Sequence, residues 1–391
     1  MTDLNEQTDT LTAALSRRGL LRGSALGVAG AALGAATAEA QTAAKGGPVS
    51  VKPDGTYETV ALEKEVLALG VMQMRVRPID IKNVKQSRKA NLDHMIAGID
   101  ASHGLLSRPK DIMFFHEFPI TGFSSSWTRK DIHDKIAIDL PGEETEALSK
   151  KAKEFNSYIV FGSYARDKDW PGHVLSITTI IDNTGAIIAK QWKARNIMGV
   201  FGQIELFTTT IYGALDRYVE MYGADAVAPV ARTPRGNIAT TSVQREPELI
   251  RAFAFKGAEI CLRTATGGFS PWDIQANAAY NQMWTAVCNN AISPGAIELG
   301  VLEDAGGGHS AIYDPRGEMV AQANSAFEQD VVGTIPIAQY RKAHRQPAVA
   351  WELYKPVYDK YVAQYPSGHY SKTQPDDLYA AKKLMDSVKR Y

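Results

Sequence analysis

Few residues in this sequence have a type and spacing suited to catalysis. The two cysteines, Cys261 and Cys288, each lie inside an apolar run, where a free thiol commonly serves as a small buried hydrophobe. The eight histidines are scattered, with no His-Glu-x-x-His motif and no paired cysteines, so we expect neither a metal site nor a cofactor.

Two charged residues are better placed, because each follows an expected strand. Glu117 comes after the apolar run at 112–115, and a carboxylate directly after a buried strand has to face solvent, a partner or a cleft. Lys193 follows residues 186–192, the second strand of a hairpin whose turn is Asn-Thr-Gly at 183–185. The ordinary alternatives are an exposed loop carboxylate for Glu117 and a solvated hairpin lysine for Lys193.

The elements that must position these side chains alternate between strands and helices. Strands are expected at 67–74, 112–115, 158–162, 174–183, 186–192, 236–241, 260–264, 285–289, 308–313 and 318–323, and helices at 83–105, 143–155, 247–257 and 272–283. This order, with two hairpins, predicts an α/β protein with mixed sheets. The tyrosine-rich tail from about Trp351 is expected to pack on the surface or on a partner subunit, and disorder is the alternative for its last third.

The N-terminus is typical of an export signal. Arg17 and Arg18 precede a weakly apolar run at 26–33, and Ala38-Glu39-Ala40 has the small-x-small pattern of a cleavage site. The paired arginines are similar to a twin-arginine signal. We therefore predict a signal peptide at 1–40, a lead segment at 41–59, and a periplasmic or extracellular mature protein.

Composition limits the partners. Of 391 residues, 45% are hydrophobic, and Lys plus Arg balances Asp plus Glu at 43 each. A neutral chain gives no reason to expect nucleic-acid or anionic-membrane binding. After the signal, no segment reaches the roughly 18 uninterrupted apolar residues of a membrane span. A small-molecule substrate fits this composition.

Five segments, in order, resemble the nitrilase (carbon–nitrogen hydrolase) superfamily. They are 115–123, which runs from Glu117 to Gly-Phe; 184–193; 247–260, with Pro-Glu-Leu-Ile-Arg and Gly-Ala-Glu; Asn281 and Asn290; and 308–317, with Asp-Pro-Arg-Gly. The likeness covers roughly residues 60–345 and leaves 346–391 as a C-terminal extension. It implies a four-layer αββα sandwich with two mixed β-sheets, assembled as a homodimer or larger homo-oligomer.

The resemblance also implies roles for individual residues. Family members use a Glu-Lys-Cys triad, in which the thiolate attacks a nitrile or amide carbon. Glu117 matches the glutamate that takes and returns protons, and Lys193 matches the lysine that stabilises negative charge on the intermediate. Glu205 resembles a second glutamate that orients substrate or lysine. His116, beside the expected base, either lines the pocket or packs beneath the loop.

The nucleophile position departs from the family pattern. The family cysteine lies six residues before the proline that here is Pro247, which places Thr241 at that position and Ser242 beside it. Three alternatives remain open. A hydroxyl of Thr241 or Ser242 attacks after deprotonation by Glu117, more slowly than a thiol would. The site binds a ligand or catalyses a different reaction. Otherwise water attacks directly, or a cysteine such as Cys261 is supplied from elsewhere.

We therefore expect an exported enzyme, similar to carbon–nitrogen hydrolases, that acts on a small amide, nitrile or carbamoyl compound. The alternative is a protein of the same fold that binds a ligand or partner without hydrolysis, or that catalyses a non-hydrolytic reaction. The aromatic-rich insertion at 197–235 either lines a pocket for an apolar ligand or covers the sheet.

Overall fold

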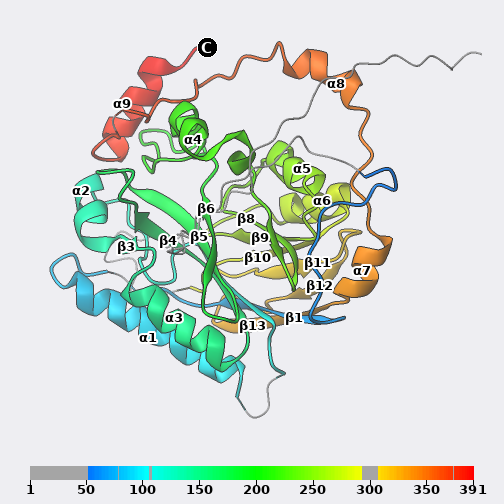
Figure 1. The fold of residues 1–391 in the computed structure, drawn as a ribbon. Helices are drawn as coiled ribbons and strands as arrows, with labels where there is room; N and C mark the ends of the chain where they lie inside the picture. The colour runs from blue at the N-terminus through cyan, green and yellow to red at the C-terminus, as the bar shows by residue number, and fades with distance from the viewer. Residues whose placement is uncertain (1–51, 78, 105–107, 293–306, 373) are drawn as a thin grey trace, which may run out of the picture. The chain divides into compact units, whose positions relative to one another are not determined.

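The computed structural model describes residues 52–77, 79–104, 108–292, 307–372 and 374–391 (Figure 1). The predicted signal peptide at 1–40 and most of the predicted lead segment at 41–59 lie outside these ranges. Among the described residues, no helix combines the length and apolar character needed to cross a membrane.

Two mixed β-sheets form the centre of the fold. The first has the strand order β13-β1-β2-β4-β5-β6, and β3 also pairs with β4. Its strands are β1 (Leu67–Gln73), β2 (Ile112–Phe115), β3 (Ile138–Asp139), β4 (Tyr158–Arg166), β5 (Leu175–Ile181), β6 (Ile187–Trp192) and β13 (Gln329–Ile335). β1, β2 and β4 run parallel, whereas β13, β5 and β6 are antiparallel to their neighbours.

The second sheet has the order β12-β11-β10-β9-β8-β7. Its strands are β7 (Ala231–Thr233), β8 (Gly236–Thr241), β9 (Ile260–Thr264), β10 (Trp284–Cys288), β11 (Ala311–Tyr313) and β12 (Met319–Gln322). β8, β9 and β10 are parallel, and the pairs at the two edges are antiparallel. The predicted strands and both predicted hairpins are confirmed, with ends that differ by a few residues.

The inner faces of the two sheets share one apolar core. It includes Leu69, Val71 and Phe114 from the first sheet, and Ile260 and Leu262 from the second. Successive side chains of a strand point to opposite faces, so the residues between these point outward to the helices.

Helices cover both outer faces (Figure 1). α1 (Val84–Ser102) and α3 (Glu143–Glu154) pack on the first sheet, and α5 (Pro247–Phe255) and α6 (Pro271–Asn281) pack on the second. The predicted four-layer αββα sandwich is therefore confirmed. The remaining helices are α2 (Arg129–Asp131), α4 (Leu215–Tyr222), α7 (Ile337–Ala343), α8 (Trp351–Tyr358) and α9 (Leu378–Val388), with shorter helical turns at Ile132–Ile136, Tyr212–Ala214 and Ala224–Val227.

Candidate active site

Glu117 is the second residue after β2, which is a central strand of the first sheet. Its backbone N–H donates to the carbonyl oxygen of Ala265 at 3.4 Å, and Ala265 follows β9 of the second sheet. The carboxyl ends of β2 and β9 therefore meet, and the Glu117 side chain lies where the two sheets adjoin. The residue is buried, with 6% of its surface exposed.

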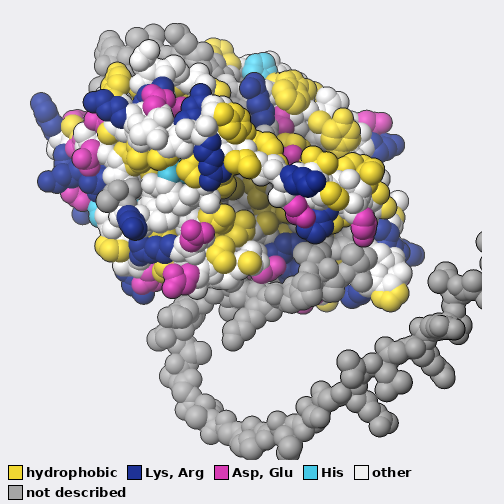
Figure 2. All heavy atoms as spheres, turned by 90° about the horizontal axis from the view of Figure 1, so that it is seen from above, with side chains coloured by type: hydrophobic (Ala, Val, Ile, Leu, Met, Phe, Trp, Pro, Cys, Tyr) yellow, Lys and Arg dark blue, Asp and Glu magenta, His cyan; other side chains and the backbone are white. Residues whose placement is uncertain are grey.

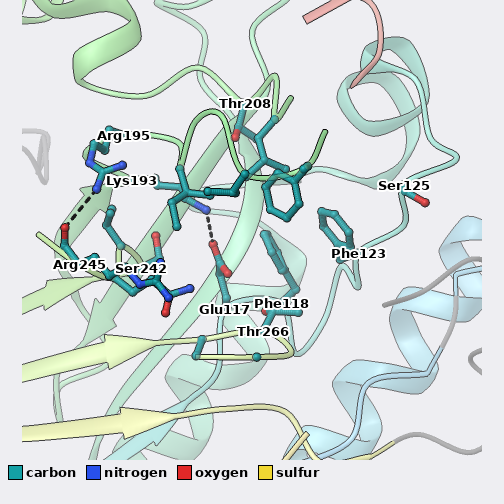
Figure 3. A pocket seen from close by; sticks show the side chains of 18 of the residues that line it. Glu117, Phe118, Phe123, Ser125, Lys193, Arg195, Thr208, Ser242, Arg245 and Thr266 are labelled. Atoms are coloured by element: carbon teal, nitrogen blue, oxygen red, sulfur yellow. Dashed lines mark hydrogen bonds and ion pairs between the residues drawn. The ribbon is translucent and has the colours of Figure 1, made fainter. Parts of the chain in front are cut away.

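Glu117 forms an ion pair with Lys193, which follows β6. The lysine Nζ donates to Glu117 Oε1 at 3.0 Å, and the lysine and glutamate side chains are 12% and 8% exposed (Figure 3). The ordinary alternatives for both residues, an exposed loop carboxylate and a solvated lysine, are thus not what the structure shows. A paired, largely desolvated carboxylate and ammonium can move a proton and stabilise a developing oxyanion.

The pair lies in the wall of a cavity of about 440 Å³. Polar and charged residues of the wall are Glu117, Ser125, Lys193, Arg195, Thr208, Ser242, Gln244, Arg245, Arg263 and Thr266. Apolar and aromatic ones include Phe118, Phe123, Tyr164, Ile197, Val200, Phe201, Ile204, Leu206, Val243, Ala265 and Leu378. A cavity of this size, mostly apolar with a few converging polar groups, is typical of a small-molecule site.

Two arginines and two phenylalanines of the wall lie on different sides of the ion pair (Figure 3). Arg195, Arg245 and Ser242 lie to one side of it, and Phe118 and Phe123 lie to the other. The first part of the aromatic-rich insertion, at 197–208, forms much of the wall, so this segment does line a pocket.

The two hydroxyls at the expected nucleophile position are placed differently. Ser242 lines the cavity, and its hydroxyl has no hydrogen-bond partner among the described residues. Thr241, the last residue of β8, is buried outside the wall, and its Oγ1 accepts the backbone N–H of Val243 at 3.1 Å. Because Thr241 already caps its own turn and Ser242 faces the cavity, Ser242 is the better candidate for attack on a ligand.

Neither cysteine reaches the cavity wall. Cys261, in β9, is fully buried between Ala239 and the apolar face of α5, and burial raises the pKa of its thiol to about 12. Burial likewise raises the pKa of Cys288 well above its usual range. A thiol in such surroundings stays protonated and unreactive.

Two residues expected to bind substrate lie outside the cavity wall, so a substrate-binding role for them stays a prediction. His116 is fully buried beneath Glu117, its Nδ1 accepts the Phe118 N–H at 3.3 Å, and burial lowers its pKa to about 3. Glu205 is 2% exposed and accepts the Gly199 N–H at 2.6 Å, while its neighbours in the chain line the cavity. Glu205 is therefore not part of the wall, although its two neighbours are.

Arg263 and Leu378 are among the wall residues that the sequence-based expectation did not include. Arg263 lies in β9 and is 4% exposed; burial lowers the pKa of its guanidinium to about 10, so it remains charged at neutral pH. The sequence did contain a signal for Arg263, because it is a charged residue inside the apolar run at 260–264. Leu378 begins α9, and its carbonyl oxygen accepts the Glu205 N–H at 3.1 Å. Nothing in the sequence around Leu378 indicates that it reaches the site.

Within the described ranges, no group of three or more His, Cys, Asp or Glu residues is arranged to hold a metal ion. The groups that these ranges bring to the cavity are the ion pair, the serine hydroxyl and the surrounding arginines.

Comparison with known proteins identifies the family of this chain. The family model described as carbon–nitrogen hydrolase matches residues 69–345, and the chain belongs to this family, within the nitrilase superfamily. It is similar to a formamidase of Helicobacter acinonychis, 25% identical over 55% of this chain and 60% of that protein. It is also similar to the omega-amidase NIT2-B of Xenopus laevis, 26% identical over 53% of this chain and 71% of that protein. The chain thus spans less than two thirds of the formamidase.

Solved structures share the fold. A carbon–nitrogen hydrolase of Helicobacter pylori G27 superposes with a TM-score of 0.56 at 17% identity, covering 75% of this chain and 98% of that one. An amidase from a Nesterenkonia species gives a TM-score of 0.52 at 15% identity, covering 76% of this chain and 98% of that one.

Proposed function

We propose that this protein hydrolyses a carbon–nitrogen bond of a small amide, nitrile or carbamoyl compound. The observation that carries the proposal is the buried Glu117–Lys193 ion pair in the wall of a cavity, in a chain of the carbon–nitrogen hydrolase family. For an amide the overall reaction adds water across the C–N bond, giving a carboxylic acid and ammonia or an amine.

Each residue has a defined part in this proposal. Glu117 takes the proton of the attacking hydroxyl and returns it to the leaving nitrogen. Lys193, 3.0 Å from that carboxylate, stabilises the negative charge that develops on the former carbonyl oxygen. Ser242 supplies the hydroxyl, forming an acyl ester that water then hydrolyses.

Direct attack by water is the alternative within the same function. Ser242 makes no hydrogen bond to Glu117 in the structure, so a water molecule between them would have to relay the proton or attack by itself. The same observation favours a second candidate function, a ligand-binding protein that has lost hydrolysis.

The decisive experiment is a screen of the protein beginning at Gln41 against short amides, nitriles and carbamoyl compounds, with ammonia release as the readout. We expect release, and a fall of roughly 10²- to 10⁴-fold for Glu117→Gln. Glu318→Gln, an exposed carboxylate outside the cavity, is the matched control. Absence of release from every compound would favour the binding function.

The nucleophile is identified by three further variants. Loss of activity in Ser242→Ala, with a mass increase on Ser242 in the unmodified protein equal to the acyl group without the leaving nitrogen, supports the acyl-ester route. Activity retained in both Ser242→Ala and Thr241→Ala, but lost in Glu117→Gln, supports direct water attack. Loss in Cys261→Ala alone would contradict the proposed site.

We further propose that the protein is exported through its N-terminal signal and acts in the periplasm or outside the cell. Arg17 and Arg18 support this proposal. Replacing both by lysine should retain the precursor in the cytoplasm, as fractionation would show. Export that is unchanged by the double substitution would contradict a twin-arginine route.

A homo-oligomer is the assembly that we propose. In α8 and the segment after it, a set of large apolar side chains is exposed: Trp351, Leu353, Tyr354, Val357, Tyr358, Tyr361 and Val362. Hydrophobic side chains are plentiful on the face seen from above in Figure 2. Light scattering should give a multiple of the chain mass, and Leu353→Lys with Val357→Lys should reduce it; a monomeric native protein would contradict the proposal.

A further inference from the structure

Arg263 is a buried cation whose hydrogen-bonding capacity is only partly used. Its Nε donates to the carbonyl oxygen of Val243 at 3.3 Å, and its guanidinium lies 5.5 Å from the centre of the Phe269 ring. Its Nη1 is buried without a hydrogen-bond partner among the described residues, and no carboxylate of that part of the chain lies within ion-pair distance. A buried charge without a partner is costly, so an anion that reached Arg263 would be bound strongly.

The cavity wall as a whole is positively charged. It contains four basic side chains and one acidic side chain, Glu117. Lys193 is paired with Glu117, and Arg195 is paired with Glu246, so their charges are compensated. The remaining two, Arg263 and Arg245, make no ion pair within the described residues.

Two carboxylates, Asp273 and Glu117, act electrostatically on Arg263, and both are already engaged, Glu117 by Lys193. Asp273, in α6, accepts the backbone N–H of Arg245 at 2.9 Å and a side-chain N–H of Asn277 at 3.2 Å. Its charge raises the pKa of Arg263, although burial outweighs it and lowers the pKa overall. Asp273 moderates the positive charge of Arg263 without supplying the missing hydrogen-bond acceptor.

A second orphaned polar atom lies in the same wall. Thr266 Oγ1 is buried and has no hydrogen-bond partner among the described residues. Thr266 Oγ1 and Arg263 Nη1 are thus two polar atoms of residues in one wall whose hydrogen-bonding capacity is unused, and a polar group of a ligand would satisfy them. Arg263 and Thr266 come from the end of β9 and the residues just after it, so one group can be received by the same segment.

Arg263 is close to the ion pair. Ala265, whose carbonyl oxygen accepts the Glu117 N–H, is two residues farther along the chain, about 7 Å at the rise of a strand. An anion held by Arg263 therefore lies in the same cavity as a group that reacts at Glu117, whose charge acts on Arg263. The aromatic residues Phe118 and Phe123 lie on the other side of the pair from Arg245 (Figure 3).

We propose that Arg263 binds a carboxylate of the substrate, and that the substrate is an N-acyl amino acid or a similar amide with a carboxylate on one side of the C–N bond and an apolar acyl group on the other. A guanidinium offers paired N–H donors that match the two oxygens of a carboxylate. The substrate class rests on the proposed hydrolysis, whereas the binding role of Arg263 does not.

The test uses two probes that cannot be hydrolysed. The first, 3-benzoylpropanoate, has the shape of N-benzoylglycine with a methylene in place of the nitrogen; the second, butyrophenone, has a methyl group in place of the carboxylate. Affinities are measured by calorimetry on the unmodified protein and on Arg263→Gln, Arg263→Lys and Thr266→Val. Arg166→Gln, a surface arginine paired with Asp139, is the matched control.

We expect the unmodified protein to bind the carboxylate probe at least tenfold more tightly than butyrophenone. Arg263→Gln should weaken the carboxylate probe by about 10- to 100-fold and leave butyrophenone unchanged, because a charge-assisted hydrogen bond is lost. Arg263→Lys should lie between the two, and Thr266→Val should weaken the carboxylate probe less than Arg263→Gln does. Arg166→Gln should change neither affinity.

Equal affinity for the two probes in the unmodified protein would overturn the proposal, even if Arg263→Gln fails to fold. Equal weakening of both probes by Arg263→Gln would also overturn it, because that pattern reflects a general structural change. Failure of the proposed function is distinguishable: probe binding as expected, with no ammonia released from the screened compounds and no glycine released from N-benzoylglycine, would leave the carboxylate site in place and remove only the hydrolysis. Hydrolysis of substrates without tighter binding of the carboxylate probe would instead support the proposed function and remove the carboxylate site.

Discussion

The backbone of Glu117 lies directly against Gly162 of β4. A β-carbon built on Gly162 would stand 2.3 Å from the carbonyl oxygen of Glu117 and 2.7 Å from its Cα, and the Gly162 N–H donates to the carbonyl oxygen of His116 at 3.1 Å. Only a residue without a side chain permits this approach, so the position of the proposed acid–base group depends on a glycine of the neighbouring strand.

Gly162→Ala should displace Glu117 while leaving its chemistry intact. Because the clash is with backbone atoms, the loop after β2 must shift, and a shift of about 1 Å at a catalytic group lowers activity by about 100-fold. The overpacking should also lower the free energy of unfolding by about 1–3 kcal/mol. Steady-state kinetics and urea denaturation would show both effects; Ser163→Ala, the next residue of β4, should show neither loss.

Lys193→Met should destabilise the protein as well as inactivate it. Removing one partner of a buried ion pair leaves the Glu117 carboxylate uncompensated, at a cost of about 3–5 kcal/mol. The double variant Lys193→Met with Glu117→Gln should recover most of the stability and none of the activity. A double-mutant cycle in urea would measure the coupling, and additive single effects would show that the pair is not energetically linked.

Stability should decline in mild acid because three histidines are buried in their neutral form. Burial lowers the pKa of His116 to about 3, and of His173 and His344 to about 4 each. Below the usual pKa of about 6.5 the unfolded chain binds protons that the folded chain does not. Stability is therefore full above about pH 6.5 and is lost as the pH falls toward 4, by about 2 kcal/mol at about pH 5 for His116 alone.

Urea denaturation would measure the free energy of unfolding of the unmodified protein and of His116→Gln at about pH 7.5 and about pH 5. These two pH values lie on either side of the usual histidine pKa. The variant should lose less stability between the two pH values. An identical loss would mean that His116 does not contribute to the acid sensitivity.

Both thiols should be inert in the folded protein. Cys261 and Cys288 are fully buried, and burial raises the pKa of each, so neither offers a thiolate to a reagent. Titration with a chromogenic disulfide should find no reactive thiol in the native state and two after denaturation. Alkylation under native conditions should leave ammonia release unchanged; inhibition by the alkylating reagent would revive a cysteine mechanism.

The layers of the fold follow from hydrophobic pattern, and the sequence therefore predicts them well. The short apolar runs at 112–115 and 260–264 form central strands, and the segment from Pro247 forms a helix with proline in its first turn. Glu117 and Lys193 are predictable because each follows a recognisable strand.

The rest of the site depends on the direction in which each side chain points, and this direction differs between neighbouring residues of the chain. Thr241 and Ser242 are neighbours, yet only Ser242 reaches the cavity. Glu205 likewise lies between two wall residues, Ile204 and Leu206, and is itself outside the wall. Arg263 carries a visible signal, a charge within a buried strand, but hydrophobic pattern alone does not say what that charge faces.

Leu378 is the part of the cavity wall that lies outside residues 69–345, the stretch shared with the family. Its helix is attached to the domain by local contacts, among them the Arg129–Asp376 ion pair at 2.7 Å and the hydrogen bond from the Val174 N–H to Gln374 at 2.8 Å. The two sheets thus fix the reactive groups, while an appended segment shapes the space in front of them. Evolution can in this way change which compounds enter the cavity by altering the tail, without disturbing the sheets that hold Glu117 and Lys193.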